Sequence, residues 1–198
     1  MHFESEVPLK GIVFAEFTEF AEAQFGFDLV DEVIEAADLP SGGSYTAVGT
    51  YDHREMLSLV TELSARTQIP VEELCRLYGR HLLGRFSVLY PGFFEGVPDC
   101  FSFLKTIEDH IHVEVKKLYP DAELPSFSYE NGSSDTLTLI YRSRRPFGHL
   151  ARGLVEGAID HFGENIKTSV RDNSGEHGAE VHFSLTREAE ELRPASGF

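Results

Sequence analysis

Hydrophobic residues recur every three or four positions through the first two thirds of the chain, the spacing of helices that each bury one face. Glycine and proline residues interrupt this pattern and bound the segments. The pattern predicts helices at residues 10–25, 28–37, 52–66 and 70–89. A further helix is predicted at residues 99–119, where one apolar stripe comprises Phe101, Leu104, Ile107, Ile111, Val115 and Leu118.

The last third of the chain has a different pattern. Hydrophobic and polar residues alternate at residues 126–130 and 136–143, and again at 166–170 and 180–185, as in half-buried strands. Between these pairs, residues 147–162 return to the helical period. We therefore expect an α+β fold, in which an N-terminal helical lobe is followed by a C-terminal antiparallel sheet with a packed helix.

Length, charge and composition narrow the class of protein. The 198 residues suit a single domain, and the formal net charge of −16 argues against nucleic acid or an anionic membrane surface as a partner. No apolar run approaches the roughly 20 residues that cross a bilayer. The N-terminus is acidic, unlike a secretory signal, so a cytoplasmic location is expected. Two cysteines, Cys75 and Cys100, are too few for a disulfide framework.

The first segment with candidate chemistry is His110-Ile111-His112, within the helix predicted at 99–119. At about 100° per residue, His112 lies beside Val115 at one margin of the apolar stripe, and His110 falls near the opposite margin. Residues two apart on a helix do not face each other, so the two histidines are not expected to share a metal. The spacing alone fits either a metal ligand or an ordinary packed histidine at position 112.

The second segment is Tyr141-Arg142-Ser143-Arg144-Arg145, at the end of a predicted strand. Alternate residues of an extended chain share a face, so Tyr141, Ser143 and Arg145 point the same way. Two hydroxyls and a guanidinium in a row can bind neighbouring carboxylates through charge-assisted hydrogen bonds. The same pattern also fits a solvated edge strand.

Together, the two segments resemble the H-NOX family, the haem domain of bacterial nitric-oxide sensors and of soluble guanylate cyclases. The matching text is HVEVKKLYP at residues 112–120, followed by the pattern YxSxR at 141–145. Further matches lie at residues 10–13, 70–79 and 153–157. The resemblance implies a single domain over residues 1–186, with a helical lobe at about 9–65, a haem-binding lobe at about 66–186, and a polar tail or linker at 187–198.

The resemblance implies a role for each matching residue. His112 would be the axial ligand of a b-type haem (iron protoporphyrin IX) held between the lobes. The haem propionates would be bound by Tyr141, Ser143 and Arg145. The haem pocket would comprise Val13, Phe17, Leu82, Phe86, Ile111, Val115, Pro125, Leu150 and Leu154.

The distal side of this expected pocket carries no hydrogen-bond donor. Family members that bind O2 stably have a tyrosine at the position that aligns with Leu150, so the resemblance implies a pocket that takes NO, and CO more weakly, and rejects O2. Shifting the alignment by one residue would place His149 there, and its ring can donate a hydrogen bond. An O2 or redox sensor on the same fold, and a haem-free protein–protein adaptor, are the alternatives.

The resemblance implies a sensor and not an enzyme. The sequence has no HExxH motif, nucleophile elbow or glycine-rich phosphate loop. Family members signal to histidine kinases, cyclic-di-GMP enzymes or chemotaxis proteins, and a separate partner of such a kind is expected here. Some members also bind zinc through cysteines near the C-terminus, but residues 168–183 contain His177 and His182 without a cysteine, so no zinc is expected.

Overall fold

The computed structural model describes residues 8–176 and 178–188. It combines a helical lobe with a four-stranded antiparallel sheet, which confirms the predicted α+β class. The predicted tail at 189–198, residues 1–7 and His177 lie outside the described residues. Among the described residues, no helix combines the length and hydrophobicity needed to cross a membrane.

The helical lobe follows the predicted elements to within a residue or two. Gly26 has a φ of +90° and separates the first two helices, since this backbone conformation strongly favours glycine. The Asp52 side chain caps the third helix by accepting a hydrogen bond from the Arg54 backbone N–H, at 2.9 Å. The helices are α1 (Gly11–Phe25), α2 (Phe27–Ala36), α3 (His53–Thr67) and α4 (Val71–Leu89).

A two-stranded sheet of β1 (Pro8–Lys10) and β2 (Thr50–Asp52) was not predicted, because three-residue strands are too short to display an alternating pattern. It fastens the long loop after α2 to the start of α1. The Gly11 backbone N–H donates to Gly49 O at 2.8 Å, and a Cβ on Gly11 would lie 1.9 Å from Thr46 O. Only glycine allows this approach of the loop.

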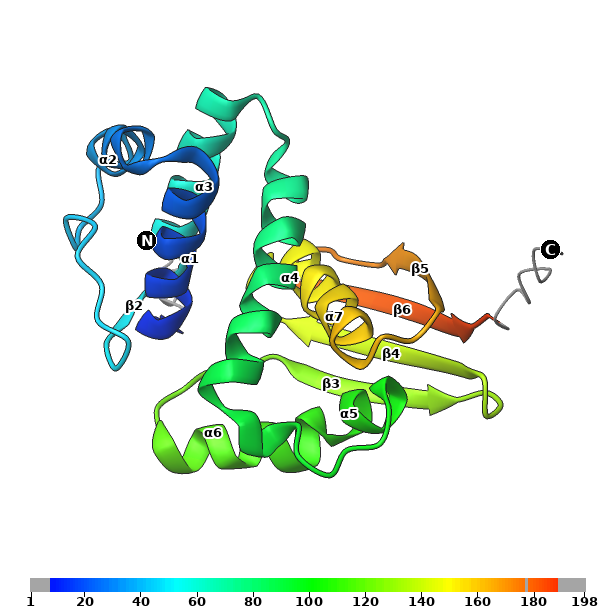
Figure 1. Ribbon diagram of the computed structural model, residues 1–198. Helices are drawn as coiled ribbons and strands as arrows, with labels where there is room; N and C mark the ends of the chain where they lie inside the picture. Colours follow the sequence, from blue (N-terminus) through cyan, green and yellow to red (C-terminus); the bar gives the residue numbers. More distant parts are fainter. Residues whose placement is uncertain (1–7, 177, 189–198) are drawn as a thin grey trace, which may run out of the picture.

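The C-terminal sheet has the strand order β3-β4-β6-β5, with every neighbouring pair antiparallel. Leu137, Leu139 and Tyr141 of β4 are buried, so this strand turns its alternate residues toward the core. Helix α7 (Gly148–Phe162) packs over the sheet (Figure 1). The strands are β3 (Ser126–Asn131), β4 (Thr136–Ser143), β5 (Ile166–Asp172) and β6 (Ala179–Arg187).

Helices α4 and α7 pack closely together, and α4 runs between helices α1 to α3 and the sheet (Figure 1). A Cβ on Gly79 would lie 2.2 Å from Leu150 O, and one on Gly153 would lie 2.0 Å from Arg76 O. The two backbones are therefore in direct contact. Ion pairs from Arg76 to Glu156 and from Arg80 to Asp160 flank this contact.

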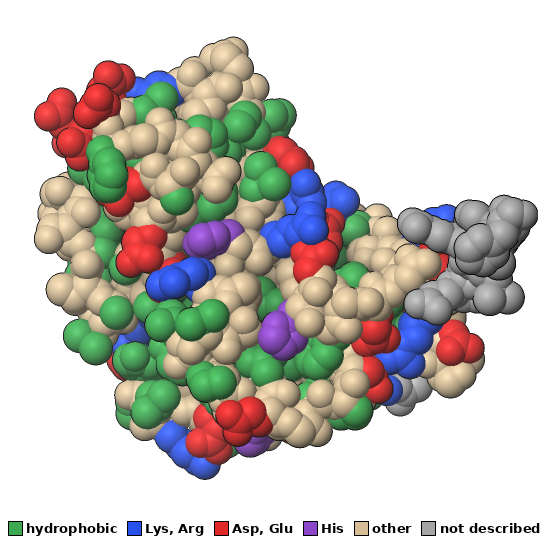
Figure 2. All heavy atoms as spheres, in the orientation of Figure 1, with side chains coloured by type: hydrophobic (Ala, Val, Ile, Leu, Met, Phe, Trp, Pro, Cys, Tyr) green, Lys and Arg blue, Asp and Glu red, His purple; other side chains and the backbone are tan. Residues whose placement is uncertain are grey.

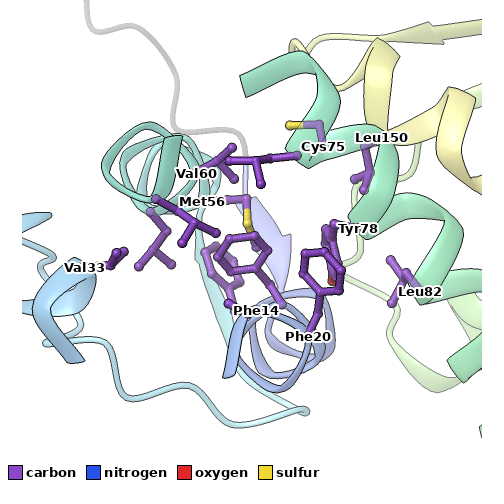
Figure 3. Packing of buried hydrophobic residues seen from close by; sticks show 14 of the residues in the cluster. Phe14, Phe20, Val33, Met56, Val60, Cys75, Tyr78, Leu82 and Leu150 are labelled. Carbon is purple, nitrogen blue, oxygen red and sulfur yellow. The ribbon is translucent and has the colours of Figure 1, made fainter. Parts of the chain in front are cut away.

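Two hydrophobic cores meet along this helix pair. In the first, side chains of α1, α2, α3 and α4 converge, with Phe14, Met56 and Tyr78 fully enclosed (Figure 3). The second lies between α7, the sheet and the helix that begins at Cys100, and it buries Phe183. On the surface, acidic side chains gather over α2 (Figure 2), where Asp28, Asp31, Glu32 and Glu35 are exposed.

Candidate functional site

The helix predicted at 99–119 is continuous, but its middle is a π-helical turn. It consists of α5 (Cys100–Thr106), the π turn η2 (Ile107–Ile111) and α6 (His112–Leu118), after a short 3-10 turn at Pro91–Phe93. The backbone N–H of His112 bonds to Ile107 O, five residues back, where a regular helix would use the residue four back. The added residue rotates α6 by about 100° relative to α5. The predicted stripe nevertheless continues across this turn, because the cavity described below is lined by Leu104, Ile107, Ile111, Val115 and Leu118.

The turn decides which way His112 faces. His112 lies against the interior, with 14% of its side chain exposed, and its ring packs 5.7 Å from that of Phe127. His110 is exposed and its ring lies 6.3 Å from Phe93. The two histidines thus diverge, as their spacing predicts.

The imidazole of His112 is prepared for binding through Nε2. Its Nδ1 lies 3.2 Å from a carboxylate oxygen of Glu108, one helical turn earlier. An ionised carboxylate only accepts hydrogen bonds, so Nδ1 carries the proton and Nε2 keeps its lone pair. Burial lowers the pKa of His112, outweighing the opposing effect of Glu108. A neutral imidazole of this tautomer is the form that ligates metals.

An apolar cavity of about 270 Å³ opens beside His112, between α1, α4, the helix 100–118, β4 and α7. Phe103, Leu104 and Ala151 are among its walls, so it extends between the two cores. Of the residues predicted to form a pocket, those that line this cavity are Val13, Leu82, Phe86, Ile111, Val115, Pro125, Leu150 and Leu154.

Phe17 is the exception among the predicted pocket residues. It is buried in the first core, where its ring makes an edge contact with Tyr78 at 5.2 Å, and it is not among the residues that line the cavity. Helical period places Phe17 one turn after Val13, on the same face of α1. Tyr78 reaches the Val13 carbonyl with its hydroxyl and, with Phe17, fills the space behind that face.

On the distal side, the structure resolves which residue of α7 faces the cavity. Leu150 lines it, whereas His149 is exposed and close enough to Asp172 to contribute to the lowered pKa of that carboxyl group. Leu82 and Leu154 flank Leu150 on the cavity wall. None of these three side chains carries a hydrogen-bond donor.

The end of β4 supplies the polar rim of the cavity. Tyr141, Ser143 and Arg145 all line it, as the alternation of the strand predicts. The Arg145 backbone N–H donates to Ser143 Oγ at 3.1 Å. Burial raises the pKa of the Tyr141 hydroxyl, although its hydrogen bond with Ser143 opposes this. The phenol therefore stays protonated and able to donate.

Arg145 is 4% exposed, which is unusual for a cation. Its guanidinium donates to the carbonyl oxygens of Pro8 and Glu123, and burial lowers its pKa from the ordinary arginine value. Within residues 8–176 and 178–188, no carboxylate forms an ion pair with it. A buried cation without a direct ion pair is costly, so this rim is suited to an anionic ligand.

Sequence reasoning missed several residues around the site. Tyr90 and Tyr119 line the cavity and share a hydrogen bond, so each hydroxyl has a partner. Lys10 donates to Asp121 at 2.9 Å and to Thr50 at 2.8 Å, fastening the loop after α6 to β1 and β2. The contacts of Lys10 join segments far apart in the chain, with separations of 40 residues to Thr50 and 111 to Asp121. No pattern along the chain indicates them.

The donor set fits a haem. A flat apolar cofactor needs apolar walls, an imidazole nitrogen for the iron, and polar groups where its carboxylates emerge. The cavity offers each of these in His112 and the rim of Tyr141, Ser143 and Arg145. Within the described parts of the chain, no three histidine, cysteine, aspartate or glutamate side chains gather as a metal site would require, and the absence of zinc stays a prediction.

Fold and site thus define a protein with an apolar cavity, suited to a flat cofactor, between helices and a sheet. The sequence model of the family described as Haem-NO-binding matches residues 10–170. The protein belongs to this family, the H-NOX family of haem-based gas sensors, as its resemblance implies.

Solved H-NOX structures agree with this assignment. The unliganded Fe(II) H-NOX protein from K. algicida is 38% identical, with a TM-score of 0.86 over 93% of this chain and 100% of that one. The H-NOX protein from S. oneidensis in the Fe(II)NO state is 25% identical, with a TM-score of 0.82 over 91% of this chain and 100% of that one.

A curated relative is the soluble guanylate cyclase gcy-35 of Caenorhabditis elegans. It is 25% identical over 175 residues, which are 84% of this chain and 25% of the cyclase. The chain therefore spans about a quarter of the length of that relative. H-NOX domains are sensor domains rather than enzymes.

Proposed function

We propose that this protein is a nitric-oxide sensor that binds haem b through His112 and signals to a separate partner protein. The haem iron would supply the gas-binding position, and the protein would supply its ligand, its orientation and its surroundings. The observation that carries the proposal is the apolar cavity, which has His112, with its Nδ1 bonded to Glu108, on one wall and the buried Arg145 at its rim.

His112 would hold the iron on one side of the cavity. Its Nδ1–H donates to Glu108, which fixes the ring in the orientation that presents Nε2. The lowered pKa keeps the imidazole neutral near pH 7, so no proton competes with the iron. His112 also begins α6, so a change in the iron–histidine bond would act directly on this helix.

Arg145, Ser143 and Tyr141 would bind the propionates. The guanidinium now bonds to two neutral carbonyls, and a propionate would supply a directly bonded negative charge. Because Arg145 also bonds to Pro8 and Glu123, it would connect the cofactor to β1 and to the loop after α6. Both lobes would thus meet at the propionate.

The side chains opposite His112 would select the gas. Iron-bound O2 carries partial negative charge and needs a hydrogen-bond donor for stable binding, whereas NO does not. Leu150, Leu82 and Leu154 line the cavity and offer no donor, which favours NO, and CO more weakly, over O2. The exposed position of His149 supports this assignment.

Absorption spectra of the purified protein test the proposal. The protein is reduced without oxygen, then exposed to air, and then to NO. A haem Soret band that does not change in air but shifts with NO supports it, and His112→Ala should remove the ligand on the protein side. A stable spectrum of an O2 complex would contradict the selectivity, and no Soret band after haem addition would contradict haem binding itself.

The proposed class of partner protein is based on membership of the H-NOX family, because the cavity itself does not indicate a partner. A histidine kinase, a cyclic-di-GMP enzyme or a chemotaxis protein is the proposed output, and its regulation would depend on the position of α6. Val113 and Leu118 of this helix are 46% and 62% exposed, so the helix that carries the ligand also presents apolar side chains to solvent.

A further inference from the structure

Glu108 makes a second contact, with strand β3, that the proposed function does not use. It lies in the π turn, and its Oε2 atom accepts two hydrogen bonds: from His112 Nδ1 at 3.2 Å and from the Phe127 backbone N–H at 2.9 Å. One carboxylate oxygen therefore connects the π turn, the start of α6 and strand β3.

Both donors are held by other contacts. Phe127 lies in β3, an edge strand of the sheet, and its ring packs against those of His112 and Tyr141 at 5.7 and 5.4 Å. Glu108 and His112 are four residues apart, a spacing that makes side chains neighbours on a helix, and Glu108 also accepts from the Phe127 N–H of β3. The hydrogen bond from the β3 backbone therefore holds the Glu108 carboxylate, while the His112 ring is held by its place at the start of α6.

A carboxylate in this position changes the imidazole as a ligand. Donation of Nδ1–H to a negative acceptor fixes the ring orientation and increases the basicity of Nε2. A stronger base binds iron more strongly and is released less readily. The neighbouring acid Asp109 is exposed in the same turn, so it provides a charge of the same sign outside this contact.

We infer that Glu108 is a positioning residue that strengthens the bond between His112 and the haem iron, and so sets how readily that bond yields when gas binds. This inference rests on the proposed ligation by His112. The strength of the iron–histidine bond would thus depend on a side chain of the π turn that does not line the cavity.

Three variants separate the charge of Glu108 from its hydrogen bonds. Glu108→Gln keeps an acceptor oxygen for Phe127 but removes the negative charge. Glu108→Ala removes both, and Asp109→Asn removes a nearby charge as a control. Each variant is studied first without haem, by amide exchange at Phe127, and then as the ferrous haem protein, by resonance Raman measurement of the iron–histidine stretch.

The expected pattern is specific. Glu108→Gln should lower the iron–histidine stretching frequency and weaken haem binding by about tenfold, the lower end of what loss of such a partner costs. In Glu108→Ala, Phe127 N–H exchange should also accelerate by about three- to tenfold, which corresponds to one lost hydrogen bond. Asp109→Asn should match the unmodified protein in both measurements.

The outcomes distinguish the two proposals. If the unmodified protein shows no iron–histidine stretch, or His112→Ala leaves it unchanged, the proposed ligation fails. If that stretch is present and depends on His112, but Glu108→Gln leaves its frequency unchanged, the role of Glu108 is refuted. An equal decrease in Asp109→Asn would also refute it, because the effect would then be general electrostatics.

Discussion

Replacement of Gly153 by alanine tests whether the contact of α4 with α7 holds the cavity together. A Cβ at this position would lie 2.0 Å from Arg76 O and 2.8 Å from Arg80 N. Both are backbone atoms of α4, so no side-chain rotation can relieve the overlap. The helices must separate, and with them the walls of the cavity that carry Leu82 and Leu154.

The size of the effect follows from these distances. An ordinary contact of a Cβ begins near 3.4 Å, so the backbones must move apart by more than 1 Å. Overpacking of this kind costs about 1–3 kcal/mol. Alanine gains up to about 1 kcal/mol over glycine in a helix, which offsets part of this cost. Separation also stretches the partly exposed ion pair from Arg76 to Glu156, worth at most about 1 kcal/mol. We expect a net loss of about 1–3 kcal/mol.

The assay is urea unfolding of the haem-free protein, with Gly84→Ala as the matched control. Gly84 lies in α4, the helix against which Gly153 of α7 packs, but a Cβ at Gly84 would meet nothing within 4 Å. Gly84→Ala should therefore stabilise the protein by about 0.5–1 kcal/mol, while Gly153→Ala destabilises it. If Gly153→Ala were as stable as Gly84→Ala, the packing argument would be refuted.

Further predictions concern the pocket, the ligand and the loop after α6. Leu150→Tyr should place a hydroxyl donor on the distal wall and allow the ferrous protein to bind O2 in air, detected by absorption; unchanged rejection of O2 would count against the pocket assignment. His112→Gly with free imidazole should restore the Soret band but abolish any NO-induced change in amide exchange within α6. The hydrogen bond from Lys10 lowers the pKa of Asp121 below 3.8, so its stabilisation is present above that pH and disappears as the pH falls through the lowered value. Unfolding midpoints of Asp121→Asn and the unmodified protein should therefore converge in acid, and a gap that persists there would contradict this.

Much of the site was predictable from the sequence because its residues lie in short, regular segments. The residues of YxSxR face one way because a strand alternates, and Tyr141, Ser143 and Arg145 all reach the cavity rim. Phe17 shows the limit of such reasoning. Its helical face points inward as expected, but the Tyr78 ring occupies the space next to it, and no local pattern reports a partner 61 residues away.

What the sequence alone determined is the set of longer helices and strands, since periodicity depends on neighbours a few residues apart. It also indicated the family, through residues that keep their spacing within single elements. What only the tertiary structure decided is the orientation of His112. Regular helical geometry leaves this residue at the margin of a stripe, and the π turn that rotates it inward is stabilised by contacts with β3, such as that of Glu108 with Phe127. Such contacts join residues that are distant along the chain, so the pattern of neighbouring residues does not predict the turn.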